Sequence, residues 1–162
     1  ADEVMPLFER FYRKDFDALR TVTQVDPDAR RLVELARREG YQVAIATQPL
    51  FPRDAILARL RWAGVPDEEF HYDWITSYEV MSACKPRRAF FRTVLDRLQR
   101  RPDECLMVGD SPEADMGAGR LGINTFWVDR NHGDDPATVR ADARGSLSDL
   151  IRLIETGQVD DL

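Results

Sequence analysis

Short apolar runs alternate with segments of helical periodicity from Pro27 to the end of the chain. The runs lie at 41–46, 73–76, 105–108 and 125–128, and each is bounded by polar or turn-forming residues. Short continuous apolar runs are typical of strands that are buried on both faces of a parallel sheet. Because parallel neighbours need crossover connections, the alternation predicts an open α/β sheet of parallel strands flanked by helices.

The segments between these runs carry helix signals. Asp26-Pro27 is typical of an N-cap followed by proline at the first helical position, and Gly40 is placed to end that helix. Before it, residues 4–19 repeat apolar side chains at helical spacing and predict an amphipathic helix. Further expected elements are helices after Pro52 and after Lys85-Pro86, a helix over 113–121, a short strand near 141–143, and a helix from Leu147 to Ile154.

Length and charge narrow the class of protein. The 162 residues are about one domain long, since domains run to roughly 100–200 residues. The net charge of −6 and the lack of a basic stripe argue against nucleic-acid binding. No apolar run is long enough to cross a bilayer, and the acidic start is unlike a signal peptide. The two cysteines form no CxxC pattern, so we expect a cytoplasmic protein without membrane contact.

Two polar residues lie near the carboxyl ends of the expected strands, where open α/β sheets bind ligands. Thr47 directly follows the run 41–46, so its hydroxyl can hold a phosphate oxygen or serve as an ordinary turn hydroxyl. Lys85 is one of only two lysines among 23 basic residues, the other being Lys14. A compact ammonium can do work that a planar guanidinium cannot. Lys85 is therefore a candidate for neutralising an oxyanion, and the alternative is a solvated surface lysine.

Two carboxylates follow the run 105–108. Asp110 ends this strand, and Asp115 comes five residues later at the expected start of a helix. Side chains so placed can converge on Mg²⁺, which takes few carboxylates and keeps several waters. The alternative is structural: Asp110 or Ser111 caps the helix, and Asp115 faces its positive end.

Taken in order, these features resemble the later sequence motifs of the haloacid-dehalogenase-like (HAD) superfamily. The motifs are a strand followed by Thr47, then Lys85-Pro86, then Gly109-Asp110-Ser111 with Asp115. Where this chain has Gln48, asparagine is usual in the subfamily that it resembles. The resemblance covers about residues 27–156. It implies a HAD-like core over 27–162, with residues 1–26 as the end of a helical cap.

The resemblance also implies a reaction and roles for the residues. It implies a Mg²⁺-dependent phosphatase that acts on a small phosphate monoester, in which an aspartate attacks phosphorus and forms an aspartyl-phosphate. Thr47 would hold the phosphoryl group with help from the Gln48 N–H, and Lys85 would offset negative charge. Asp110 would bind Mg²⁺, while Asp115 would support that metal or orient Lys85. The pair of acids favours this chemistry over that of a metal-free dehalogenase.

The first motif of the superfamily, an apolar strand ending in Asp-x-Asp, has no counterpart before Val4. In the superfamily this strand carries the nucleophile and lies at the centre of the sheet, between the strand before Thr47 and the strand before Asp110. Its absence would remove backbone hydrogen bonds and buried aliphatic side chains from the core. We therefore expect that these residues alone do not make a stable, active enzyme, and that an N-terminal segment or a partner chain completes the sheet.

Two other functions are compatible with parts of the pattern. A catalytically inactive relative could keep the phosphate and metal pocket for binding or interaction. A phosphorylation-receiver domain could also begin with Val108-Gly109-Asp110-Ser111. Receivers, however, place an acidic pair early and follow it with Thr and Lys, whereas here Thr47 and Lys85 precede the acids. The order of the motifs therefore favours the HAD-like hypothesis.

Overall fold

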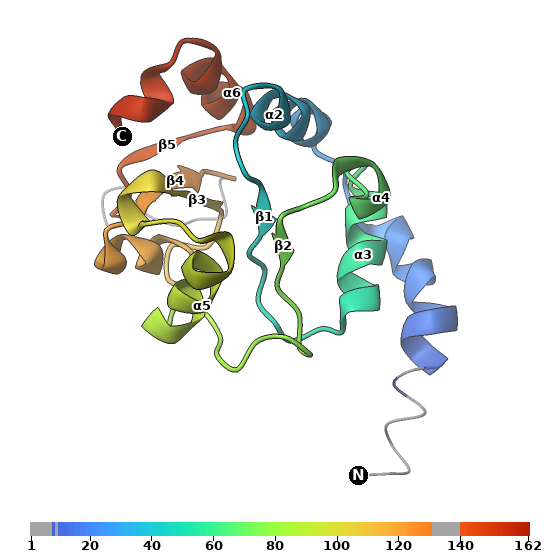
Figure 1. Ribbon diagram of the computed structural model, residues 1–162. Helices are drawn as coiled ribbons and strands as arrows, with labels where there is room; N and C mark the ends of the chain where they lie inside the picture. Colours follow the sequence, from blue (N-terminus) through green and yellow to red (C-terminus); the bar gives the residue numbers. More distant parts are fainter. Residues whose placement is uncertain (1–7, 9, 131–139) are drawn as a thin grey trace.

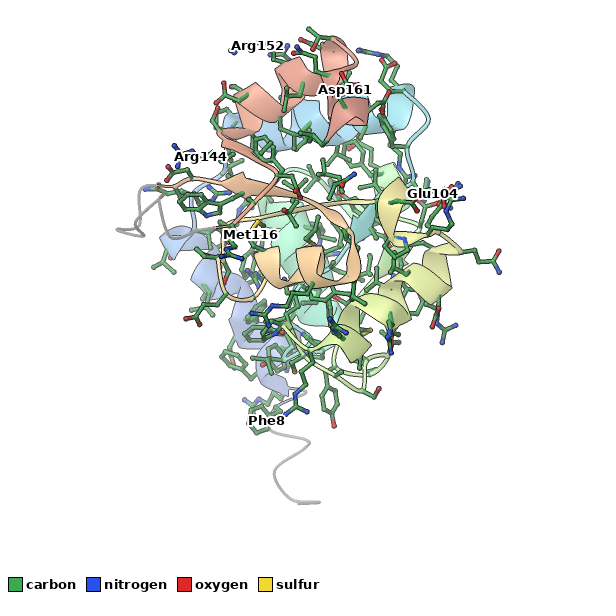
Figure 2. The ribbon with its side chains drawn as sticks, turned by 90° about the vertical axis from the view of Figure 1, so that its left-hand side faces the viewer. Phe8, Glu104, Met116, Arg144, Arg152 and Asp161 are labelled. Atoms are coloured by element: carbon green, nitrogen blue, oxygen red, sulfur yellow. The ribbon has the colours of Figure 1, made fainter. Side chains whose placement is uncertain are left out.

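The structure is a computed structural model that describes Phe8 and residues 10–130 and 140–162 (Figure 1). Its described strands form two parallel sheets rather than one. The first pairs β1 (Ala44–Ile45) with β2 (Trp74–Ile75); the second has the order β3 (Leu106–Gly109), β4 (Asn124–Val128), β5 (Ala143–Gly145). The predicted α/β class with parallel strands is confirmed, including the short strand near 141–143. The two sheets are not joined to each other in the described residues; from the sequence, we expect a further strand between the strand before Thr47 and the strand before Asp110.

The helices follow the predicted order. The α-helices are α2 (Pro27–Arg38), α3 (Arg53–Trp62), α4 (Asp67–Phe70), α5 (Arg88–Leu98) and α6 (Leu147–Glu155). Tighter 3-10 turns occur at η2 (Phe16–Val22), η3 (Pro102–Glu104), η4 (Met116–Leu121) and η5 (Gln158–Asp161), and η1 (Phe11–Asp15) is a π-helical turn. Both figures show α6 lying against α2. In the described part of the chain, no helix is long and apolar enough to span a membrane.

The start of α2 has the predicted cap. The Asp26 carboxylate accepts a hydrogen bond of 3.0 Å from the Asp28 N–H, and Pro27 occupies the first helical turn. This bond satisfies one of the N–H groups that have no partner inside the helix. Gly40 follows the helix with φ of +83°, a left-handed conformation that glycine adopts without strain.

The N-terminal segment differs from the predicted helix over 4–19. Residues 4–7 and 9 of that helix lie outside the described residues, and the remainder is divided between η1 and η2. Among the described residues of this segment, Phe16 is the buried apolar side chain, and it stacks on Trp62 of α3 with ring centroids 5.0 Å apart. The Trp62 indole N–H also donates to Asp17 at 2.7 Å. These two contacts fix η2 against α3, whereas the described stripe residues Phe8, Phe11 and Leu19 remain exposed.

Two further elements are shorter or tighter than the sequence predicts. The expected helix over 113–121 is reduced to the 3-10 helix η4, whose Gly117 approaches Pro86 so closely that a Cβ would lie 2.9 Å from the proline ring. The expected strand at 41–46 is reduced to the two residues of β1, which has a described strand partner along only one edge.

Hydrogen bonds at both ends show that the two sheets run in the same direction. At the carboxyl ends, the Lys85 ammonium donates to the Ala46 carbonyl of the first sheet at 2.9 Å, and to Asp115, beyond β3, at 2.5 Å. At the amino ends, Arg100, shortly before β3, donates to Gln42, shortly before β1, at 2.6 Å. β1 and β3 are therefore parallel neighbours with a gap between them.

A cavity of about 720 Å³ fills this gap. Its walls include residues 42–46 and 105–108 and apolar residues of α2, α5 and α6. All four residues of β3 are only partly buried, whereas residues 125–128 of its neighbour β4 are buried. An interior strand of a parallel sheet is normally covered on both faces and paired along both edges. We call this cavity the strand slot.

Backbone groups face the strand slot from both sides. The carbonyls of Val43 and Ile45 accept hydrogen bonds from the β2 segment, and the Cys105 carbonyl accepts one from Asn124, next to β3 in the second sheet. Because successive residues of a strand direct their N–H and C=O groups to opposite edges, the alternate residues face the other way. Those residues are Ala44 and Ala46 in the first sheet and Leu106 and Val108 in the second.

The amino end of β1 is held by Asp73. Its carboxylate accepts hydrogen bonds from Arg37 of α2 at 2.6 Å and from the Val43 N–H at 2.9 Å. Burial raises the pKa of this carboxyl, but the bonds from Val43 and Arg37 outweigh that effect and hold the pKa below its usual value. Asp73 is thus a charged link between α2, β1 and β2.

We predict that Asp73→Asn destabilises the protein by about 1 kcal/mol at neutral pH, because a partly exposed, charge-assisted contact is lost. A pKa that is lower in the folded state stabilises the fold above the unfolded value of about 4, and this contribution disappears as pH falls through the lower folded value. The difference in unfolding free energy between wild type and variant, measured by urea titration, should therefore shrink toward zero below about pH 4. A difference that stays constant down to pH 2 would contradict this assignment.

Candidate active site

Lys85 is the centre of the candidate site. Its side chain is only 8% exposed although it carries a charge, and its ammonium contacts the Asp115 carboxylate and the Ala46 carbonyl. The ammonium also lies 5.9 Å from the centre of the Phe90 ring. A buried charge is tolerated when it is paired and hydrogen-bonded, as this one is. Lys85 is thus a buried, paired cation, and the alternative of a solvated surface lysine is wrong.

Asp115 is the anionic partner of Lys85. It is buried; one carboxylate oxygen accepts from the Lys85 ammonium at 2.5 Å and the other from the Ser111 N–H at 3.1 Å. Gly109 makes room for it, because a Cβ at this position would lie 2.2 Å from an Asp115 oxygen. Both oxygens have partners, so within the described residues Asp115 acts on Lys85. Its proposed contact with a metal stays a prediction.

Asp110 lies in a more open environment than Asp115. Its side chain is 51% exposed and forms an ion pair of 3.0 Å with Arg130. Arg130 also lies 3.5 Å from Asp26, the residue that caps α2. The Asp110 backbone is held in addition, because its carbonyl accepts a hydrogen bond from the Trp127 indole at 3.3 Å.

Thr47 and Gln48 lie in the loop directly after β1. The Thr47 carbonyl accepts a hydrogen bond of 2.8 Å from Thr76, which fixes the backbone at this point. Among the described residues, no hydrogen bond involves the Thr47 hydroxyl, so the hydroxyl is available to a ligand. The Gln48 side chain is engaged elsewhere: its amide group contacts both the N–H and the C=O of Lys85.

The carboxylates near Lys85 are the groups that could hold Mg²⁺. Among the described residues there is no group of three or more His, Cys, Asp or Glu side chains that could hold a metal ion. Mg²⁺ nevertheless needs only one or two protein carboxylates when water and phosphate oxygens supply the rest. Asp110 fits that requirement, provided that it exchanges its contact with Arg130 for the metal. These residues therefore offer a partial metal site.

The strand slot opens at this site. Ala46 faces the slot through its backbone, and its carbonyl is the group that Lys85 contacts. A strand inserted parallel to β1 and β3 would bring its carboxyl end to the Lys85 ammonium. The structure thus places the Lys85–Asp115 pair at the Ala46 carbonyl, which follows β1, with Thr47 next in the same loop and Asp110 directly after β3.

Sequence reasoning missed two features of this site. One is Arg130, which was given no role although it forms an ion pair with Asp110. Its position could have indicated a role in the site, because it lies two residues after the run 125–128, at the carboxyl end of a strand. The other is the Gln48 side chain, whose partner Lys85 is 37 residues away in the chain. No local pattern indicates that contact.

Comparison with known proteins identifies the family. A family model described as haloacid dehalogenase-like hydrolase matches residues 5–122, which is most of the chain. The chain belongs to the haloacid dehalogenase-like hydrolases. This assignment agrees with the resemblance of the ordered motifs and favours it over the receiver-domain alternative.

Several curated HAD relatives are phosphatases. The chain is 33% identical over 138 residues to a ribulose-1,5-bisphosphate 5-phosphatase from Halopiger xanaduensis, covering 84% of this chain and 55% of the relative. It is 31% identical over 120 residues to a glyceraldehyde 3-phosphate phosphatase from Pyrococcus furiosus, covering 72% and 45%. The chain therefore spans about half the length of the curated relatives that it matches.

Solved structures show the same fold. A HAD phosphatase from Thermococcus onnurineus superposes with a TM-score of 0.69 at 29% identity, covering 92% of this chain and 63% of that one. A dehalogenase superposes with a TM-score of 0.67 at 25% identity, covering 79% and 55%. The fold is thus shared by members with different reactions, and the reaction must be argued from the site.

We predict that Gly109→Ala destabilises the fold by at least about 1–3 kcal/mol, because the new methyl group would overlap the Asp115 carboxylate and separate it from Lys85. Gly119→Ala is the matched control, since a Cβ there meets only the Thr125 methyl group at an ordinary 3.7 Å. Urea unfolding of both variants measures the difference. Equal stability of the two variants would show that Asp115 moves aside without cost.

Proposed function

We propose that this chain is the larger part of the catalytic domain of a Mg²⁺-dependent HAD phosphatase that acts on a small phosphate monoester. The observation that carries the proposal is the buried Lys85–Asp115 pair at the end of the strand slot, with the Thr47 hydroxyl available after β1. A fixed cation and a hydroxyl at a sheet edge suit a phosphoryl group. The relatives named for ribulose bisphosphate and glyceraldehyde 3-phosphate support this substrate class.

The nucleophile lies outside this sequence. We infer that an apolar strand ending in Asp-x-Asp occupies the strand slot, pairs with β1 on one edge and with β3 on the other, and places its first aspartate beside Lys85. The strand comes from an N-terminal segment of a longer polypeptide or from a partner chain. The slot supports this inference through its two parallel edges with slot-facing backbone groups, and through apolar helices that line it.

Each residue then has a defined task in phosphoryl transfer. The aspartate oxygen attacks phosphorus, the bond to the substrate oxygen breaks, and the second aspartate gives its proton to the leaving alcohol. Water then cleaves the aspartyl-phosphate to return the free carboxylate and phosphate. Thr47 donates a hydrogen bond to a phosphoryl oxygen, with the Gln48 N–H beside it. Lys85 stabilises the charge shared by the nucleophile and the phosphoryl group.

Asp110 would hold Mg²⁺, which when bound supplies positive charge next to the phosphoryl oxygens. Asp115 holds the Lys85 ammonium in place, and its second carboxylate oxygen accepts from the Ser111 N–H in the loop that also carries Asp110. Arg130 competes with the metal for Asp110, because one carboxylate oxygen cannot serve both cations equally well. We propose that the completed enzyme works in the cytoplasm, without nucleic acid or membrane.

We predict that this chain alone releases no phosphate from p-nitrophenyl phosphate. The completed enzyme, in which the Asp-x-Asp strand is present together with this chain, should release phosphate only when Mg²⁺ is added. In the completed enzyme, Lys85→Met and Asp110→Asn should each lower kcat at least about 100-fold, because each removes charge stabilisation of the transition state. Thr47→Val should cost less, since it removes one neutral hydrogen bond. Lys14→Met is the control and should leave activity unchanged.

If the completed protein binds Mg²⁺ and phosphate but turns over no monoester, the alternative of an inactive binding module replaces the phosphatase. If the Lys85 and Asp110 variants retain full activity, the assignment of the site is wrong.

A further inference from the structure

The Gln48 side chain makes a two-point contact with the Lys85 backbone. Its amide nitrogen donates to the Lys85 carbonyl at 3.1 Å, and its amide oxygen accepts from the Lys85 N–H at 2.9 Å. Both bonds are partly buried. We propose that Gln48 is a positioning residue that holds Lys85 in the site through its backbone, in addition to any contact that the Gln48 N–H makes with substrate.

The chemistry of the contact is specific to a primary amide of this length. An amide carries one acceptor and two donors, so it can satisfy the N–H and the C=O of the same residue at once. A carboxylate would keep only the bond from the Lys85 N–H. Asparagine is shorter by one methylene group and would not span the same distance from the loop after β1. The glutamine at position 48 thus matches its partner in chemistry and in reach.

Two bonds to one residue restrict how it can rotate. With its N–H and C=O both held, the Lys85 backbone is restrained relative to the loop after β1, and so is the direction of its Cα–Cβ bond. The side chain then reaches its two other partners, Ala46 and Asp115, at hydrogen-bonding distance. Ala46 and Gln48 lie in the segment directly after β1, whereas Asp115 lies in the loop after β3. The contact therefore fixes where the cation stands between the two sheets.

The consequence for catalysis rests on the proposed function, because it assumes that Lys85 stabilises the phosphoryl group. The geometric part of the proposal, that Gln48 holds the Lys85 backbone, does not depend on the proposed function. If Gln48 holds the backbone, losing its amide should let the ammonium leave Asp115 and become reactive, whether or not the protein is a phosphatase.

The lysine content of the chain makes this measurable. Lys14 is exposed and Lys85 is buried, and they are the only lysines in the sequence. Brief labelling of the intact protein with an amine-reactive acetylating reagent, followed by mass spectrometry of the two peptides, gives the ratio of Lys85 to Lys14 reactivity. Cys105, which lines the strand slot, reports opening of the fold when thiol labelling is run in parallel.

Gln48→Met keeps the length of the side chain and removes both hydrogen bonds. We expect it to raise the Lys85 to Lys14 ratio about tenfold, as two lost hydrogen bonds of ordinary net strength imply. Gln48→Glu keeps one bond and should give a smaller rise. Gln42→Met is the matched control: the same substitution just before β1, where Gln42 contacts Arg100 instead, should leave the ratio unchanged.

A ratio within twofold of wild type in Gln48→Met would overturn the proposal. So would a parallel rise in Cys105 labelling, because the effect would then come from general unfolding. If the ratio responds as expected while the completed protein shows no phosphatase activity, the proposed function fails and the role of Gln48 stands.

Discussion

The ion pair between Lys85 and Asp115 is the interaction on which the arrangement of the site depends. Lys85 contacts the end of one sheet, Asp115 belongs to the loop after the other, and both side chains are less than 10% exposed. Removing either partner would leave a buried charge unpaired, which is far more costly than losing a surface salt bridge. Gly109 leaves the space for the pair, and Gln48 holds the lysine backbone, so three separate segments serve one contact.

Much of the fold could be predicted because its signals are local. Apolar runs mark the strands, and the Asp26-Pro27 pair marks the start of α2. The segment over 4–19 was predicted less well, because its geometry depends on one distant contact, that of Phe16 with Trp62. The site follows the same rule. Thr47 and the two acids were predicted from their places after apolar runs, and Lys85 from the scarcity of lysine in the chain. The partners of Gln48 and Asp110 could not be predicted, since no local pattern encodes a contact across the fold.

Family membership and the strand slot both indicate that the sheet of this chain takes up a further strand. The HAD relatives are about twice as long as the part of them that this chain matches, and the chain holds two parallel sheets with a cavity of about 720 Å³ between them. A gap of this kind is costly, because strand edges and apolar side chains face a cavity instead of protein. The proposed strand, which ends in a carboxylate, would meet both the energetic requirement of the fold and the chemical requirement of the proposed site.

Hydrogen–deuterium exchange tests this account most directly when it is resolved to single amides and measured on the completed protein, which is this chain together with the segment or partner that carries the inferred strand. The amides of Ala44, Leu106 and Val108 face the strand slot, whereas those of Ile45 and Met107 face existing strand partners, so neighbours along the same strand serve as controls. If a strand occupies the slot, the two sets will be protected to a similar degree. If the slot-facing amides exchange orders of magnitude faster than their neighbours, the slot is open, and a site completed by an inserted strand is excluded.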